Sequence, residues 1–266
     1  MRILVTHDDG VDAPGLLALK RALDSVGETL VVAPDHNWSA SGHRKTMHKP
    51  LRLTQVRLDD GTPAYAASGS PSDCVALVML GALGVRSPNE GDFRPDLVVS
   101  GINPHPNLGQ DMTYSGTVTA AMEGIISGIP SFAVSTDSRE ATRRGVADPF
   151  AAAAEFAVVV ARKIADEGLP ADTLLNVNVP GCAKADIAGV RVTRLCRRIY
   201  RDEVVKRTDP RGRPYYWIGG EEPTAEPGEG TDFWALANGF VSITPLHLDL
   251  TAYEQMEHLQ DWVLQI

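Results

Sequence analysis

Short apolar runs alternate with helical patterns through the first half of the chain. Apolar residues at helical spacing predict helices over residues 13–26, 71–84 and 116–127. Apolar runs without polar alternation predict buried strands, which lie at residues 3–5, 30–33, 97–99 and 132–135. This strand–turn–helix order predicts an α/β fold with a mostly parallel sheet covered by helices on both faces.

Polar turns follow three of these predicted strands, at Asp8-Asp9, at residues 35–41 and at residues 100–107. Right-handed crossovers place such turns on one edge of a parallel sheet, so we expect the three to converge. The neighbouring carboxylates of Asp8 and Asp9 repel each other, and a hard divalent cation is the simplest compensation. An Asp-Asp-Gly turn that only precedes the next helix is the alternative.

The second half of the chain has a different pattern. It predicts an Ala-rich helix over 151–165, strands over 174–179 and 240–245, and a closing amphipathic helix over 251–262. Residues 194–231 are rich in charge, Pro, Gly and Tyr. Within them, a turn at residues 209–212 flanked by aromatic residues predicts a projecting β-hairpin. Exposed aromatic residues on a hairpin indicate a partner surface, often a second copy of the chain; a hairpin folded back on its own domain is the alternative.

Composition narrows the class of protein. The 266 residues are 43% hydrophobic and 22% charged, as expected for a soluble globular chain, and we treat residues 1–266 as a single α/β domain from which 194–231 projects. The net charge of −9 without a Lys/Arg block argues against a nucleic-acid partner. The sequence predicts neither a membrane span nor a signal peptide. Three widely spaced cysteines, Cys74, Cys182 and Cys196, indicate reduced thiols and a cytoplasmic location.

The converging turns carry oxygen donors almost exclusively. Such donors suit Mg²⁺ or Mn²⁺ far better than Zn²⁺, and they are supplied by Asp8, Asp9, Ser39, Ser41, Asn103, Asn107, Ser115 and Thr117. The sequence Ser115-Gly116-Thr117 opens a predicted helix, whose free N–H groups and dipole suit a phosphate oxygen. The same three residues could instead form a helix cap without a ligand.

The motifs ILVTHDDGVDAPG, VVAPDHNWSASG, PDLVVSGINPHPNLGQDMTYSGTVTAAMEG and TDFWALANGFVSITPL together resemble the SurE family of survival-protein nucleotidases over essentially the whole chain. The resemblance implies a three-layer, Rossmann-like SurE fold with a projecting C-terminal β-hairpin that is exchanged between subunits of a homodimer or homotetramer. It also implies a metal-dependent phosphatase that hydrolyses nucleoside 5′- and 3′-monophosphates, and short polyphosphate as well. The ligands of one divalent ion per subunit, Mg²⁺ or Mn²⁺, would be Asp8, Asp9, Ser39 and Asn103.

We therefore expect Asp8 and Asp9 to be catalytic, with Asp8 favoured slightly as the proton acceptor. The predicted phosphate contacts are Ser41, Asn107, Ser115, Gly116 and Thr117. His43 and His105 are the two candidates for an acid that protonates the leaving alcohol. The chain departs from the common family pattern at His7, which stands where Asn is frequent, and at His105, which replaces a Gly. Neither change removes a predicted ligand, but both alter the expected nucleoside pocket.

Other classes fit the sequence less well. A dinucleotide-dependent oxidoreductase would carry GxGxxG after the first strand, and a serine hydrolase would carry GxSxG; the sequence has neither. A non-catalytic metal- or nucleotide-binding module remains open, because ligand residues do not establish turnover. Metal-dependent release of phosphate from AMP distinguishes that module from the enzyme.

Overall fold

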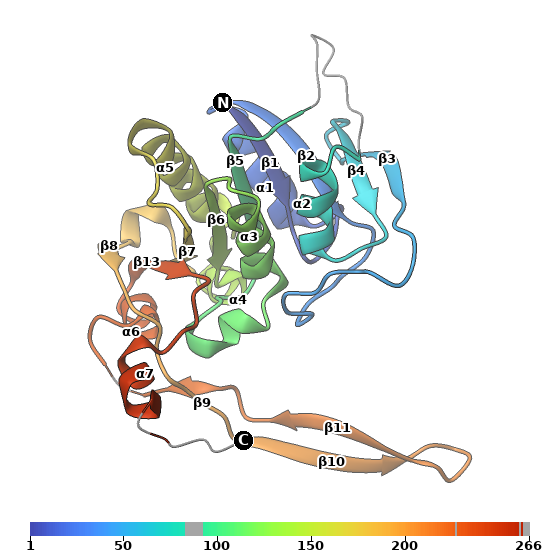
Figure 1. The fold of residues 1–266 in the computed structure, drawn as a ribbon, viewed down its shortest axis with the longest axis vertical. Helices are drawn as coiled ribbons and strands as arrows, with labels where there is room; N and C mark the ends of the chain where they lie inside the picture. The colour runs from blue at the N-terminus through green and yellow to red at the C-terminus, as the bar shows by residue number, and fades with distance from the viewer. Residues whose placement is uncertain (83–92, 227, 261, 263–266) are drawn as a thin grey trace.

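The computed structural model describes residues 1–82, 93–226, 228–260 and 262, and within them a nine-stranded sheet lies between two layers of helices (Figure 1). The sheet order is β3-β4-β2-β1-β5-β6-β7-β13-β8. The strands are β1 Arg2–Thr6, β2 Glu28–Pro34, β3 Leu53–Arg57, β4 Pro63–Ala67, β5 Leu97–Asn103, β6 Ser131–Thr136, β7 Thr173–Val179, β8 Gly189–Val192, β9 Arg198–Ile199, β10 Asp202–Thr208, β11 Pro214–Gly220, β12 Thr224–Ala225 and β13 Phe240–His247. The helices are α1 Pro14–Leu23, α2 Pro71–Met79, η1 Gly109–Thr113, α3 Gly116–Ile126, α4 Ser138–Arg143, α5 Ala151–Glu167, η2 Lys184–Asp186, α6 Asp232–Ala237 and α7 Tyr253–Gln260.

The centre of the sheet is parallel, as the sequence predicts. β1 pairs in parallel with β2 on one side and with β5 on the other, and Val5 is in register with both Val31 and Val99. The chain order therefore reverses at β1, and such a switch point opens a crevice at the carboxyl ends of the strands. Two pairs depart from the parallel order: β3 runs antiparallel to β4, and β13 runs antiparallel to β7.

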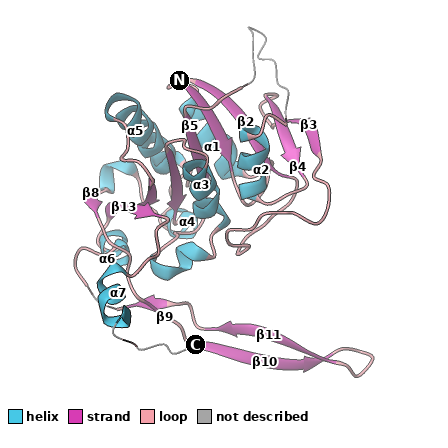
Figure 2. Cartoon of the chain, viewed as in Figure 1, coloured by secondary structure: helices cyan, strands magenta, loops and turns pink. Residues whose placement is uncertain are grey.

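Helices bury both faces of this sheet, which confirms the three-layer prediction (Figure 2). On one face, α1 packs with α5 and buries Leu16 and Leu19 completely. On the other face, α2 packs with α3 and buries Val75 and Ala120 completely. None of the helices among the described residues combines the length and the apolar character that crossing a membrane would need.

Two predicted helix ends differ from the structure. The helix predicted to reach Gly84 ends at Met79, and Gly84 itself lies outside the described residues. The first helix ends at Leu23, before the predicted stop at Gly27. A Cβ on Gly27 would lie 2.1 Å from the backbone oxygen of Met1, so this glycine is required by a close backbone approach rather than by a helix cap.

Strands β10 and β11 form the predicted hairpin, which we call the arm (residues 202–220). They pair antiparallel from Asp202 opposite Gly220 to Thr208 opposite Pro214. Every residue of both strands is exposed, and the arm extends away from the sheet (Figure 1). The alternative in which the hairpin folds back on its own domain is therefore wrong.

The closing helix, predicted over residues 251–262, is shorter than expected. It spans Tyr253–Gln260, and all eight of its residues are exposed. Its apolar side chains Tyr253, Met256 and Leu259 are therefore not buried in a core within the described chain. The predicted closing helix therefore forms over a shorter range, with every one of its residues exposed.

Candidate functional site

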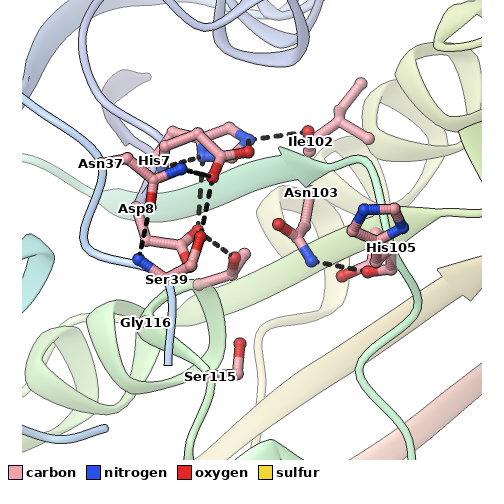
Figure 3. A network of polar contacts seen from close by, with 12 residues as sticks. His7, Asp8, Asn37, Ser39, Ile102, Asn103, His105, Ser115 and Gly116 are labelled. Carbon is pink, nitrogen blue, oxygen red and sulfur yellow. Dashed lines mark hydrogen bonds and ion pairs between the residues drawn. The ribbon is translucent and has the colours of Figure 1, made fainter. Parts of the chain in front are cut away.

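The ends of three strands meet around one cavity, as the turns predict (Figure 3). Asp8 and Asp9 follow β1, the loop after β2 supplies Ser39, and Asn103 ends β5 rather than lying in a turn beyond it. The cavity has a volume of about 470 Å³, and its lining residues are Asp8, Asp9, Asn37, Ser39, Ala40, Asn103, Pro104, His105, Asn107, Asp111, Tyr114 and Ser115.

Asp8 is the most buried carboxylate of the cavity, with only 4% of its surface exposed. The Thr117 hydroxyl donates to its Oδ1 at 2.5 Å. A Cβ on Gly116 would lie 2.6 Å from the Cβ of Asp8 and 3.0 Å from its Oδ2, so the glycine leaves the space that the aspartate occupies. Burial acts to raise the pKa of Asp8, whereas His7, when its ring is protonated, and the Thr117 hydroxyl act to lower it, with a net downward shift. The side chain is therefore a carboxylate at neutral pH.

His7 joins the β1 turn to the end of β5. Its ring is completely buried, its Nε2 lies 2.7 Å from the Ile102 carbonyl oxygen, and the Asp9 amide donates to its Nδ1 at 2.8 Å. Burial acts to lower the pKa of His7, whereas Asp8, Asp9 and the Ile102 carbonyl raise it, with a net upward shift. The Asp9 amide nevertheless needs a lone pair on Nδ1, so we assign the neutral ring with its proton on Nε2 in this geometry. A cation held by the two carboxylates would also oppose protonation.

Asp9 is held by the loop after β2. Its Oδ1 accepts hydrogen bonds from Asn37 Nδ2 at 2.6 Å and from Ser39 Oγ at 3.0 Å. Asn37 also accepts the Ser39 amide at 2.7 Å, which fixes the loop locally. Asn37 was not among the predicted site residues. Its position in a polar turn that was expected to face two carboxylates is the signal that could have identified it.

The predicted donor set fits a hard cation. Asn103 Nδ2 donates to the His105 carbonyl at 2.6 Å, which leaves the Asn103 amide oxygen free as a ligand. Two carboxylates, this amide oxygen and the Ser39 hydroxyl are all oxygen donors of the kind that Mg²⁺ and Mn²⁺ prefer. Across the described part of the chain, no three His, Cys, Asp or Glu side chains are grouped to hold a metal.

The amino-terminal end of α3 forms another part of the cavity wall. Ser115 caps the helix and accepts the Val118 amide on its Oγ at 3.2 Å. The backbone N–H groups of Gly116 and Thr117 lie in the first turn of α3, where no carbonyl of the same helix can accept a hydrogen bond from them. They form the positive end of the helix dipole. Ser115 lines the cavity, whereas Gly116 and Thr117 do not, and the Thr117 hydroxyl is already bonded to Asp8. Any contact of Thr117 with phosphate would therefore come from its backbone.

The two other predicted phosphate contacts lie in different surroundings. Asn107 lines the cavity, but its hydrogen-bond donors are already used. Its side-chain Nδ2 donates to Ser135 Oγ at 2.8 Å, and its backbone N–H donates to Asn178 Oδ1 at 2.8 Å. Asn107 thus anchors the loop after β5. Ser41 does not line the cavity, and its buried Oγ has no hydrogen-bond partner among the described residues. The Ser41 hydroxyl is free to bond if the loop moves toward a ligand.

The two candidate histidines differ in where they face. His43 Nε2 lies 3.1 Å from Glu123 of α3, and Lys45 donates to the other Glu123 oxygen at 3.0 Å. The hydrogen bond from His43 lowers the pKa of the buried Glu123 carboxyl, and Lys45 adds to this effect against the influence of burial. His43 therefore anchors the loop to α3 and does not line the cavity. His105 does line the cavity and is exposed.

Two further lining residues, Asp111 and Tyr114, were not predicted as site residues. Asp111 lies on η1, and Tyr114 follows it directly before the Ser115 cap. Asp111 stands between the motif SGIN (residues 100–103) and the motif YSGT (residues 114–117), and Tyr114 is the first residue of the second motif. Because both motifs were placed at the site, the short segment joining them had to lie near it, and this signal was available in the sequence.

The chain is similar to known proteins over nearly its whole length. The family described as "Survival protein SurE" matches residues 3–202. The chain is 52% identical over 259 residues to "5'-nucleotidase SurE" of Herpetosiphon aurantiacus, covering 97% of each chain. It is 49% identical over 262 residues to the protein of the same name from Chloroflexus aggregans, covering 98% of this chain and 99% of the relative. The crystal structure of the SurE protein from Aquifex aeolicus superposes with a TM-score of 0.80 at 44% identity, covering 98% of each chain.

Proposed function

The chain belongs to the SurE family, and on that premise we propose that it is a metal-dependent phosphatase that hydrolyses nucleoside 5′- and 3′-monophosphates to nucleoside and phosphate, and short polyphosphate as well. The observation that carries the proposal is the meeting of Asp8 and Asp9 with the amino-terminal end of α3 in one cavity. Its volume of about 470 Å³ suits a small-molecule ligand. Relatives that align over nearly the whole chain carry the name 5'-nucleotidase.

The cation would be held by Asp8, Asp9, Ser39 and Asn103. When bound, Mg²⁺ or Mn²⁺ supplies positive charge to a phosphoryl oxygen and makes the attacking water more acidic. Each of the four proposed ligands is held by a neighbour: Asp8 by Thr117, Asp9 by Asn37, Ser39 by Asn37 and Asp9, and Asn103 by the His105 carbonyl. Such second contacts keep ligand oxygens oriented and contribute to metal affinity.

The phosphate group would bind at the start of α3. The N–H groups of Gly116 and Thr117 are aimed out of the first turn of the helix, and Ser115 lines the cavity beside them. Donors fixed in advance stabilise the charge that develops on phosphoryl oxygens during transfer. Ser41 and Asn107 are proposed as outer contacts, with Ser41 supplying its unpaired hydroxyl.

The proton of the attacking water would pass to Asp8, assisted by the negative charge of Asp9. One Asp8 oxygen accepts the Thr117 hydroxyl, which leaves Oδ2, beside Gly116, as the atom that receives the proton. The lowered pKa of Asp8 keeps this oxygen ionised and available at neutral pH.

The direct test is a panel of AMP, 3′-AMP, GMP and tripolyphosphate assayed for released phosphate with Mg²⁺, with Mn²⁺ and with EDTA. We expect release from both AMP isomers with either metal and none with EDTA. Binding of AMP and Mn²⁺ without any phosphate release would instead establish the non-catalytic binding module.

We also propose that the chain forms a homodimer or homotetramer by exchanging the arm. The arm exposes large apolar side chains on both of its faces, with exposed fractions of 68% at Val204, 57% at Tyr216 and 82% at Ile218 on one face and 63% at Trp217 on the other. Val204 lies directly opposite Ile218, and neighbouring exposed apolar side chains of this kind mark protein interfaces. Light scattering after gel filtration should give two or four chains per particle, and Trp217→Ser should reduce that number. Val192→Ser, which alters an apolar residue 76% exposed on β8, is the matched control and should leave assembly unchanged.

A further inference from the structure

The short helix η1 is attached through Asp111 to residues 196–200, which lead into the arm and which we call its base. Arg198 of β9 donates from Nε to Asp111 Oδ2 at 2.8 Å, and the Tyr200 hydroxyl donates to Asp111 Oδ1. The Arg198 amide also donates to Gln110 Oε1 at 2.8 Å. Partial burial, with the Asp111 carboxylate, raises the pKa of Tyr200 to about 12, so its hydroxyl stays protonated as the donor.

A second set of contacts fixes the start of η1 to the chain that leads into the arm. Asp232 is completely buried, and its two oxygens accept the Gly109 amide at 2.7 Å and the Cys196 amide at 2.9 Å. A Cβ on Gly109 would lie 2.5 Å from the Cys196 carbonyl oxygen. Because the two backbones touch and share a buried carboxylate, η1 cannot shift without disturbing the base of the arm.

The same segment forms part of the cavity wall. Asp111 and Tyr114 line the cavity, and Ser115, which follows Tyr114, caps α3. With the phosphate held at α3, the rest of a nucleotide must extend along the remaining wall, which includes His105, Asp111 and Tyr114. Tyr114 is 63% exposed, so its ring is available to contact a base or a ribose.

We propose that Asp111 is a positioning residue that fixes the η1 wall of the cavity to the base of the arm and thereby sets the affinity for the nucleoside part of the substrate. The proposal rests on the proposed nucleotidase function. Tyr200 and Arg198 act through Asp111, because neither lines the cavity. The arm is thus connected to substrate recognition and not to the phosphate chemistry at α3.

The test compares two substrates, AMP and p-nitrophenyl phosphate, the second of which has no nucleoside. We expect Tyr200→Phe to raise KM for AMP about threefold and Asp111→Ala about tenfold, with kcat within about twofold, because hydrogen bonds to a charged group are lost. KM for p-nitrophenyl phosphate should stay within about twofold. Tyr253→Phe is the matched control, since its hydroxyl donates to Asp249 outside the cavity, and it should leave both constants unchanged.

A double variant with both Tyr200→Phe and Asp111→Ala tests whether Tyr200 acts through Asp111 or the two residues affect AMP binding independently. If Tyr200 acts through Asp111, the variant carrying both changes should be no worse than Asp111→Ala alone. A parent-like KM in Tyr200→Phe, or equal increases for both substrates, would overturn the proposal. Thermal unfolding by circular dichroism checks that each variant folds. If the parent protein releases no phosphate, the nucleotidase proposal fails, and calorimetric Kd values of the parent and the variants for AMP then test the role of Asp111. If the parent does not bind AMP, both proposals are overturned.

Discussion

The cavity wall has two halves that differ in how they are held. The buried half consists of Asp8 and Ser115, neither more than 7% exposed, and it lies where β1 ends and α3 begins, with the Thr117 hydroxyl bonded to Asp8. The exposed half, with Ser39, His105 and Tyr114, lies on loops. The sheet core therefore positions Asp8 and the start of α3, which are proposed to act on phosphate. Surface segments and their anchors position Ser39, a proposed cation ligand, together with His105 and Tyr114, which are proposed to meet the nucleoside. Substitutions in the buried half should have the larger effects.

The largest effect is expected at Asp8. Asp8→Asn keeps the side-chain volume but removes the charge that would hold a cation and the oxygen that would take a proton. Phosphate release from AMP should fall by at least about a hundredfold, with no fall in the thermal midpoint. Asp59→Asn, at an exposed position, is the control. A near-normal rate in Asp8→Asn would remove Asp8 from the chemistry.

Gly116 tests how tightly the buried half is packed. The new methyl of Gly116→Ala would lie 2.6 Å from the Asp8 Cβ, so the aspartate must move. Because the added methyl overpacks the site, we expect the variant to lose about 1–3 kcal/mol of stability. Because Asp8 is displaced, we expect turnover to fall about ten- to hundredfold. Gly219→Ala is the matched control, because nothing lies within 4 Å of a Cβ there and the residue is in the arm. Equal behaviour of the two variants would show that the contact does not matter.

Glu123 tests the anchor of the exposed half. Folding lowers the pKa of the Glu123 carboxyl, so the ionised carboxylate stabilises the folded protein. This stabilisation is fully present at pH values above the pKa of Glu123 in the unfolded chain. It is lost as the pH falls through the lower pKa of Glu123 in the folded protein. Glu123→Gln should cost about 1–2 kcal/mol at pH 7 and less as the pH falls below 4. Urea unfolding between pH 7 and 3 measures this difference. Glu155→Gln, which breaks an exposed pair with Lys184, should cost little at any pH.

The smallest effect is expected at His43. Because its ring faces Glu123 and does not line the cavity, His43→Gln keeps a donor for the carboxylate and should leave phosphate release within about twofold. A matched rate profile over pH 5–9 for the variant and the parent is the check. A loss of tenfold or more would place His43 at the reaction after all.

The sequence predicted the buried half better than the exposed half. β1 and the start of α3 are marked by an uninterrupted apolar run and by a capping serine, which are local signals. β3 was missed because its residues are half-buried or exposed and give no strong pattern. The use of the Thr117 hydroxyl by Asp8, and the attachment of Asp111 to the arm, depend on contacts between distant segments. Such contacts leave no mark in either segment alone.

The direct pairing of β1 with β5 has a consequence for how the protein is made. Ile3 is in register with Leu97, so the neighbouring strand that carries Asn103 is synthesised long after the aspartates of the first turn. Closing so long a loop is slow compared with forming a local hairpin. The nascent chain therefore exposes Asp8 and Asp9 before their partners exist, and the proposed cation site is complete only late in folding, when the middle of the chain has joined the first strand.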